Sequence, residues 1–354
     1  MRVVLLNPYH YPYMGGIEHR LHEVSCRLAG KHEMIVLTSQ LPGTDLEEER
    51  DGYRIVRLPS RFIDIYNPPF VSTPGVLEAL QRLDPDVVDF HYRWAPSYTK
   101  AMKRYGGKWV FTFHNTYGEG HGPSRVPSLI NDALFCRIIR KRRVICITEF
   151  IRGDLLKRGF DPALLDVIPP GIEVPAEAGK EGDYILFVGR LVGTKGIPYL
   201  IRAMDRVDGR LIIVGDGPER ERLESVVRSA GVREKVTFTG RVTEERKIEL
   251  LSNCKVFAMP SLFESYGLAV AEAMSWGKPV VASRVGGLPE AVGDGGVLVP
   301  PRDSKAIAAA LNLLLKDDEV RRATARRARE HILRFSWDNI VHDVEATYRK
   351  VAEE

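Results

Sequence analysis

Short apolar segments alternate with longer segments of helical periodicity along the whole chain. In the first half, the apolar segments carry the β-branched and aromatic residues typical of buried strands. They cover residues 3–7, 34–39, 53–58, 86–91, 109–114 and 144–148. The spacing of apolar positions between them predicts helices, among others at residues 18–29 and 74–83.

The second half repeats this alternation. Its apolar segments cover residues 184–188, 210–214, 235–239, 256–259, 279–282 and 296–299. Helices are predicted at residues 218–230, 244–253 and 267–276, and from residue 305 onward with a break near residues 335–337. Strands that alternate with helices form parallel sheets covered on both faces. The sequence therefore predicts an α/β protein with two doubly wound domains.

Two prolines and a glycine mark the boundary between the two series. Pro169, Pro170 and Gly171 stop the preceding elements, and a polar segment follows. We place the first domain at residues 1–170 and the second at residues 171–337. Open α/β sheets bind ligands at the carboxyl ends of their strands, so a cleft between two such domains is the expected ligand site.

Composition narrows the class of protein. The 354 residues are 44% hydrophobic and 28% charged, which excludes a disordered or fibrous chain. The net charge of +4 argues against a general nucleic-acid binder. No apolar run reaches the roughly 20 residues that span a bilayer, and the first one is too short for a signal peptide. The four cysteines show no CxxC spacing, so a cytoplasmic location is expected.

The segment at residues 260–274 offers an anion-binding helix start flanked by two carboxylates. It follows the predicted strand 256–259 and opens a helix near Gly267. Unpaired backbone N–H groups and the helix dipole favour a diphosphate there. Glu264 and Glu272 suit neutral hydroxyl groups, such as those of a sugar, from which they accept hydrogen bonds. The alternative is an ordinary helix start with an acidic first turn.

Two cations follow the predicted strand 184–188 in a glycine-bearing loop. Arg190 and Lys195 suit a diphosphate, above all one that gains negative charge as a leaving group. The alternative is a solvated basic loop.

A Gly-x-Gly pattern at Gly215 lacks the third glycine of a dinucleotide fingerprint, because Arg220 stands there, so we expect no nicotinamide cofactor.

In their order along the chain, these motifs resemble the retaining glycosyltransferases of the GT-B fold, in the set called group 1 or family 4. The resemblance extends over nearly the whole chain. Besides the Glu-x7-Glu pair and the basic pair, it rests on Gly15-Gly16, His91, His114, Pro170-Gly171-Ile172, Gly240-Arg241-Val242, Gly286-Gly287-Leu288-Pro289-Glu290 and Phe335-Ser336-Trp337.

The resemblance implies two Rossmann-like domains that face each other across a cleft. The last helix, at residues 338–354, would join the first, acceptor-side domain, and the second domain would hold a nucleotide-sugar donor. Arg190 and Lys195 would bind the diphosphate of the donor. Glu272 would bind its ribose, and Glu264 would bind a hydroxyl of the donor sugar.

Further positions follow from the same resemblance. The N–H groups of Gly267 and Leu268 would reach the phosphate and the sugar. Val242 would border the base, and Gly16 would begin a helix near the phosphates. His114 would lie beside the reacting sugar, near the acceptor.

The family transfers with retention at the anomeric carbon, explained by front-face attack in which the leaving phosphate takes the acceptor's proton. We therefore expect a hexosyltransferase that uses no metal and no other cofactor, since Arg190 and Lys195 supply the neutralising charge. Asn115 follows His114 where many relatives have Asp, and Pro170 stands where Asn is common. His91 and Asn115 are secondary acceptor-side candidates. An alternative role for His91 is structural, at the end of a strand.

The expected partners are a UDP- or GDP-sugar and a hydroxyl acceptor, which is a saccharide, a lipid or a polyprenyl-linked glycan.

From Arg137 to Arg143, five of seven residues are cations. They form either a solvated helix end or a patch for anionic lipid headgroups at the cytoplasmic face of a membrane. The apolar, loop-like segment at residues 61–74 is either an acceptor-side flap or buried. Glu18 and Arg20 either face the cleft or are ordinary first-turn helix charges, and we favour the second interpretation.

Two other classes of function are compatible with these motifs. One is a different chemistry on the same fold, such as a nucleotide-sugar epimerase or a phosphorylase. The other is a sugar-nucleotide-binding protein without activity.

Overall fold

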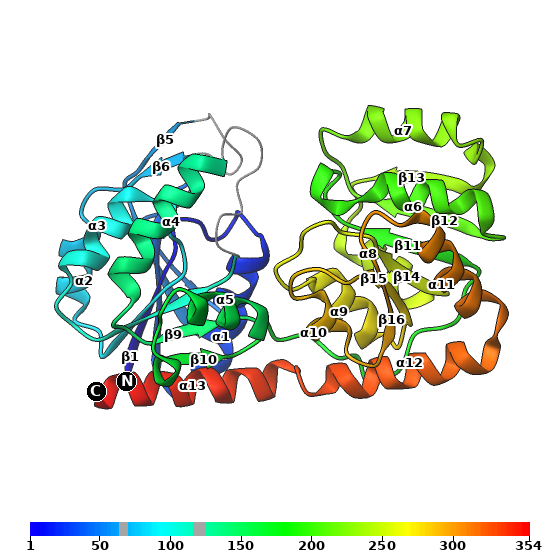
Figure 1. Ribbon diagram of the computed structural model, residues 1–354. Helices are drawn as coiled ribbons and strands as arrows, with labels where there is room; N and C mark the ends of the chain where they lie inside the picture. The colour runs from blue at the N-terminus through cyan, green and yellow to red at the C-terminus, as the bar shows by residue number, and fades with distance from the viewer. Residues whose placement is uncertain (64–69, 116–124) are drawn as a thin grey trace. The chain divides into compact units, whose positions relative to one another are not determined.

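The computed structural model describes residues 1–63, 70–115 and 125–354. These residues form two compact units (Figure 1). Unit 1 comprises Met1–Gly171 and Trp337–Glu354, and unit 2 comprises Ile172–Ser336. Each of the two boundaries between the units lies one residue from the boundary expected from the sequence.

Unit 1 is built on an eight-stranded sheet with the order β10-β9-β8-β7-β1-β2-β4-β3. Every neighbouring pair is parallel except β3, which runs antiparallel to β4. The strands are β1 (Arg2–Leu6), β2 (Glu33–Ser39), β3 (Glu47–Arg50), β4 (Tyr53–Leu58), β7 (Val87–Phe90), β8 (Trp109–Phe113), β9 (Val144–Cys146) and β10 (Leu165–Val167). The strand order reverses at β1, where a doubly wound sheet binds its ligand.

The C-terminal helix belongs to the core of unit 1. Helix α13 (Trp337–Glu353) packs against α1 (Gly16–Leu28), β7 and β8 (Figure 1). Its buried apolar face repeats at helical spacing, with Ile340, Val344, Tyr348 and Val351. The other helices of unit 1 are α2 (Val76–Leu83), α3 (Pro96–Arg104), α4 (Arg125–Ile139) and α5 (Glu149–Lys157).

Unit 2 contains a six-stranded parallel sheet with the order β13-β12-β11-β14-β15-β16. Its strands are β11 (Tyr184–Val188), β12 (Arg210–Val214), β13 (Val236–Gly240), β14 (Val256–Met259), β15 (Val280–Ser283) and β16 (Gly296–Val299). Its helices are α6 (Ile197–Ala203), α7 (Arg220–Ser229), α8 (Glu244–Asn253), α9 (Leu268–Ser275), α10 (Leu288–Val292), α11 (Ser304–Lys316) and α12 (Asp318–Leu333). The strand order of this sheet reverses beside β11.

Some elements were not expected from the sequence. Strand β3 consists of charged residues and forms because it pairs with β4. The helical tail has a second break, where the side chain of Asp317 accepts a hydrogen bond from the N–H of Val320 and caps α12. The ends of the apolar segment 61–74 pair as two antiparallel strands, β5 (Arg61–Ile63) and β6 (Phe70–Ser72), so these ends are not loops. Residues 64–69 lie outside the described residues.

Candidate active site

The sheet order of unit 2 brings together the loops that carry its candidate residues. Strands β11 and β14 are neighbours, so the loops that follow them leave the same edge of the sheet. The backbone N–H of Leu262, after β14, donates to the carbonyl of Thr194, after β11, at 2.7 Å. The two loops therefore form one connected surface at the switch point.

A close ion pair joins these two loops. Lys195 Nζ lies 2.5 Å from Glu264 Oε2. The Ser261 hydroxyl donates to the same oxygen at 3.4 Å. Both charged side chains are largely buried, with 21% of Lys195 and 15% of Glu264 exposed. Because the pair is only partly solvated, either charge without its partner would be costly, unless a ligand supplied the missing charge or hydrogen bonds.

The loop after β15 fixes the backbone of Glu264. The N–H of Gly287 donates to the carbonyl of Glu264 at 3.1 Å. Gly286 has a φ of +53°, and a Cβ placed there would lie 1.9 Å from the same carbonyl oxygen. Only glycine allows this approach, so the position of Glu264 depends on the glycine pair Gly286-Gly287.

Helix α9 begins beside Glu264. Its N-cap residue, Gly267, has a φ of +102° and offers no side chain to cap the helix. A Cβ at this position would lie 3.7 Å from Cγ of Glu264, and Leu268 is the first helical residue. The N–H groups of this helix start have no side-chain cap, and an anion is suited to them.

Glu272 lies further along α9 and is held by a residue that the sequence analysis missed. Lys247 Nζ, on α8, lies 3.0 Å from Glu272 Oε1 and 2.7 Å from Glu244 Oε1. Burial opposes the charge of Lys247, but the two carboxylates outweigh it and raise the pKa of this ammonium. The spacing of Glu244 and Lys247 along a predicted helix was visible, whereas the contact with Glu272 depends on helix packing.

The remaining donor-side candidates make no such contacts. Arg190 is exposed, and its side chain has no ion-pair partner among the residues that the structure describes. Val242 is half-buried just after β13. The structure therefore brings Lys195, Glu264 and Gly267 together and leaves Arg190 as an exposed cation in the loop after β11.

In unit 1 the candidate residues follow β1, β7 and β8, which are neighbours at the switch point. Gly16 is the first residue of α1 and is exposed. Glu18 is buried and accepts a hydrogen bond from Asn7 Nδ2 at 2.9 Å, and burial raises the pKa of its carboxyl. Arg20 is also buried and donates to the carbonyl of Pro169 at 2.9 Å.

Glu18 thus lies in the first turn of α1, as interpreted, but the sequence analysis did not foresee that Glu18 and Arg20 are buried. Both side chains point into the packed end of the sheet, where Asn7 and the backbone at Pro169 provide their partners. Helical periodicity places these residues on the first turn of α1 but does not show that this turn is covered.

The two histidines of the sequence analysis are in contact. His91 Nδ1 lies 2.9 Å from His114 Nε2. His91 is buried, whereas His114 and the following Asn115 are partly exposed. Burial lowers the pKa of His114 well below its ordinary value. His114 is therefore a neutral imidazole at the carboxyl edge of the unit 1 sheet.

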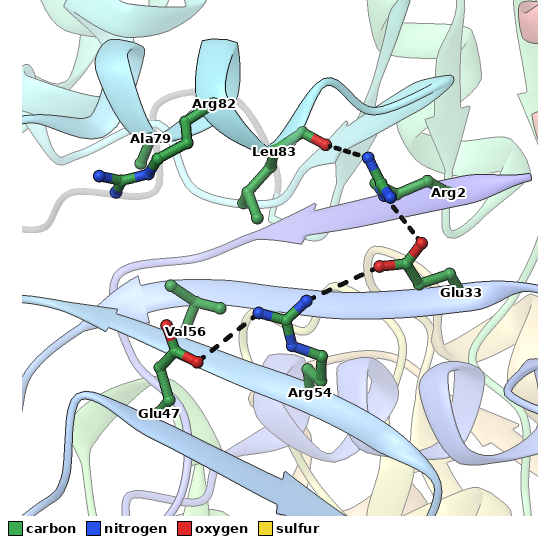
Figure 2. Close-up of a pocket in the computed structure, with 8 residues that line it drawn as sticks. All are labelled: Arg2, Glu33, Glu47, Arg54, Val56, Ala79, Arg82 and Leu83. Carbon is green, nitrogen blue, oxygen red and sulfur yellow. Dashed lines mark hydrogen bonds and ion pairs between the residues drawn. The ribbon is translucent and has the colours of Figure 1, made fainter.

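A concave region of unit 1 lies at the opposite, amino end of the strands. Figure 2 shows it lined by charged side chains, with Arg2 contacting Glu33 and Arg54 reaching Glu33 and Glu47. These cations already have carboxylate partners, and the strand ends here are not those at which α/β sheets bind ligands. We therefore do not assign the substrate to this pocket.

The basic segment after α4 is only partly a surface patch. Arg137, Arg140, Lys141 and Arg142 are exposed. Arg143 is buried, with Asp166 at 3.1 Å and Glu354 at 2.5 Å, so its inclusion in a surface patch was wrong. Charge alone gave no indication that Arg143 anchors the C-terminus.

Within the described part of the chain, no helix has both the length and the apolar character required to cross a bilayer. In the same residues, His, Cys, Asp and Glu side chains form no group of three or more placed to hold a metal ion.

Solved structures of glycosyltransferases share this fold. Sucrose-phosphate synthase from Thermosynechococcus elongatus superposes with a TM-score of 0.79 at 22% identity, covering 99% of this chain and 98% of that one. The Anabaena protein HepE in complex with UDP-glucose superposes with a TM-score of 0.79 at 20% identity, covering 99% and 100%. The protein is thus an α/β protein of the GT-B glycosyltransferase fold.

Sequence comparisons define the family. The model of "Glycosyltransferase Family 4" matches residues 14–174, and that of "Glycosyl transferases group 1" matches residues 173–331. A D-inositol 3-phosphate glycosyltransferase from Acidothermus cellulolyticus is 32% identical, over 80% of this chain and 71% of that protein. A phosphatidyl-myo-inositol mannosyltransferase from Mycobacterium leprae is 30% identical, over 99% and 97%. The chain belongs to the family 4 glycosyltransferases.

Replacing Gly286 by alanine should destabilise unit 2, because the new Cβ would collide with the Glu264 carbonyl. Gly231→Ala is the matched control, since Gly231 has a similar φ of +67° with no atom within 4 Å of the added Cβ. We expect Gly286→Ala to cost about 1–3 kcal/mol more than the control, or roughly 2–10 °C in the midpoint measured by scanning calorimetry. Equal midpoints for the two variants would contradict this account of the Glu264 backbone.

Proposed function

We propose that this protein is a retaining hexosyltransferase that moves a sugar from a UDP- or GDP-sugar to a hydroxyl acceptor. The observation that carries the proposal is the Lys195–Glu264 pair, between the loops after β11 and β14 and beside the start of α9. A cation, a carboxylate and a helix N-terminus together match the three parts of a sugar diphosphate: its charge, its hydroxyls and its phosphate oxygens.

In this proposal the donor replaces the internal ion pair. The diphosphate takes the Lys195 ammonium, and a hydroxyl of the sugar donates to the released Glu264 carboxylate. The N–H groups of Gly267 and Leu268 face the phosphate and the sugar. Glu272 accepts from the ribose while Lys247 holds its second oxygen in place, and Val242 borders the base.

Charge stabilisation in the transition state would come from the chain itself. As the glycosidic bond to the diphosphate breaks, negative charge grows on the leaving oxygen. Lys195 and Arg190 are fixed cations that meet this charge, and we therefore propose transfer without a metal ion. The leaving phosphate takes the proton of the acceptor hydroxyl on the same face, which retains the anomeric configuration.

The acceptor side of the proposal rests on unit 1. The neutral His114 can accept a hydrogen bond from a hydroxyl, and Gly16, His91 and Asn115 are its neighbours at the carboxyl edge of the sheet. Two relatives carry the names of glycosyltransferases for D-inositol 3-phosphate and for phosphatidyl-myo-inositol. We propose a polyol, free or linked to a lipid, as the acceptor, and the cytoplasm as the location.

The test is a screen of purified protein with UDP-, GDP- and ADP-sugars, following release of the nucleoside diphosphate. We expect one donor to be hydrolysed slowly and Lys195→Ala and Glu264→Gln to lower the rate by about 10²–10³-fold. Arg210→Ala, which removes an exposed cation at the amino end of β12, is the control and should leave the rate unchanged.

Other results of this screen would overturn the proposal. A donor returned as its epimer would indicate the epimerase, and a pyridoxal absorbance band would indicate a phosphorylase. Binding without release would indicate a silent sugar-nucleotide-binding protein.

We also propose that unit 1 contacts an anionic membrane through α4 and the residues that follow it. Ile130 and Leu134 are 57% and 54% exposed, one helical turn apart, and Arg137 continues the same face. Arg140 and Lys141 extend the positive charge beyond the helix. Exposed apolar side chains next to cations suit a surface of anionic headgroups.

Replacing Arg137, Arg140 and Lys141 by alanine should weaken binding to phosphatidylglycerol-containing vesicles. At about 1 kcal/mol per charge near the surface, the loss is roughly a hundredfold in a sedimentation assay. Replacing Lys305, Arg322 and Arg326 of unit 2 removes the same charge from exposed positions and should have little effect. Equal losses in both triple variants, or no binding by the unaltered protein, would contradict the proposed surface.

A further inference from the structure

A chain of buried polar groups connects the C-terminal helix to His114. Its centre is Asp89, a carboxylate that is 1% exposed in the middle of the apolar strand β7. Tyr348, on α13, donates its hydroxyl to Asp89 Oδ2 at 2.7 Å. Thr112, on β8, donates to Oδ1 at 2.8 Å. Two hydroxyl donors therefore converge on this carboxylate.

The Asp89 carboxylate also lies against the histidine pair. Asp89 Oδ2 lies 3.2 Å from His91 Nε2, at an angle too oblique for a regular hydrogen bond. The contact is therefore chiefly electrostatic. On the opposite side of the ring, His91 Nδ1 meets His114 Nε2 at 2.9 Å. The groups follow one another in the order Tyr348, Asp89, His91 and His114.

A purely structural role explains this arrangement poorly. A buried carboxylate costs several kcal/mol in desolvation, and apolar residues of similar volume are usually no less stable at such positions. Strand β7 is otherwise made of Val87, Val88 and Phe90, all buried. A buried ionisable group near the ligand-binding end of a sheet is a candidate for orienting a reacting group.

For a neutral His91, the electrostatics of this chain select one proton arrangement. A nitrogen lone pair facing the Asp89 carboxylate at 3.2 Å would be repelled, so His91 Nε2 carries a proton. When the His91 ring is neutral, its Nδ1 then carries the lone pair. This Nδ1 must therefore accept a hydrogen bond from the N–H at His114 Nε2. His114 is neutral because burial opposes its charge, and its Nδ1 is left with a lone pair.

We propose that Asp89 and Tyr348 are positioning residues, which act through His91 to fix the tautomer of His114 and to keep its Nδ1 as a hydrogen-bond acceptor for the acceptor substrate's hydroxyl. Within the described residues, Nδ1 of His114 has no hydrogen-bond partner. The inference rests on the proposed function, because the proposed function supplies the acceptor hydroxyl that this lone pair orients.

The inference also gives the C-terminal helix a role beyond packing. Tyr348 is fully buried, and burial together with the nearby Asp89 raises the pKa of its phenol well above the ordinary value. It therefore remains a hydroxyl donor at all working pH values. Its position on α13, which enters unit 1 only at Trp337, makes the acceptor side depend on the last residues of the chain.

Nitrogen NMR of the ¹⁵N-histidine-labelled protein reads the tautomers directly, without any substrate. Signals are assigned with the His91→Gln and His114→Gln variants. We expect His114 to carry its proton on Nε2 in the unaltered protein and to populate the Nδ1–H tautomer in Asp89→Asn, because a neutral amide no longer fixes the proton of His91. Tyr348→Phe should alter the ¹⁵N signals of both histidine rings. It takes the place of Asp89→Asn in this experiment if that variant does not fold.

Tyr98→Phe is the matched control, since it removes a buried hydroxyl of unit 1 that bonds to Ser39 at 2.8 Å and does not touch the histidines. It should leave the histidine signals unchanged. With the donor that gives turnover, Asp89→Asn should lower transfer by about 10–100-fold, the scale of losing an outer-shell partner that orients a metal-bound imidazole, while donor hydrolysis without acceptor is retained.

The outcomes separate this inference from the proposed function. A proton on His114 Nδ1 in the unaltered protein, or identical tautomers in Asp89→Asn, overturns the inference even if a donor is hydrolysed. Absence of turnover with every donor overturns the proposed function, and the NMR result still decides the tautomer.

Discussion

The Lys195–Glu264 ion pair depends on one property of parallel sheets, which is that neighbouring strands end at the same edge. Because β11 and β14 are neighbours, a cation after one strand meets a carboxylate after the other. Backbone hydrogen bonds from Leu262 to Thr194 and from Gly287 to Glu264 then hold both loops in place. In the proposed function, a nucleotide sugar separates the two charges and provides a partner for each.

Unit 1 uses the same edge geometry with different chemistry. Its switch point presents imidazoles in place of an ion pair, and the buried Asp89 lies against His91 of this pair. A neutral hydrogen-bond acceptor suits a hydroxyl nucleophile, whereas cations suit a departing diphosphate. In the proposed function, the two units thus divide the chemistry that glycosyl transfer requires.

The strands and the order of the motifs could be predicted from the sequence, because buried parallel strands are continuous apolar runs. Residues 184–188, 210–214, 256–259 and 296–299 are strands at the predicted bounds. Strand β3 could not be predicted, since its charged residues form a strand only by pairing with β4.

The candidate site was predictable where the chemistry is local. The loops carrying Arg190, Lys195 and Glu264 follow recognisable strands. Lys247 and Tyr348 make their contacts from other helices, 25 residues from Glu272 and 259 residues from Asp89. Asp89 did give a local signal, as a charge inside an apolar strand.

The most direct test of the central claim is a crystal structure of the protein with the nucleotide sugar that it hydrolyses. The account predicts that Lys195 contacts the diphosphate, that Glu264 accepts from a sugar hydroxyl, and that the contact between the two side chains is lost. A nucleotide sugar bound elsewhere, with the Lys195–Glu264 pair intact, would contradict it.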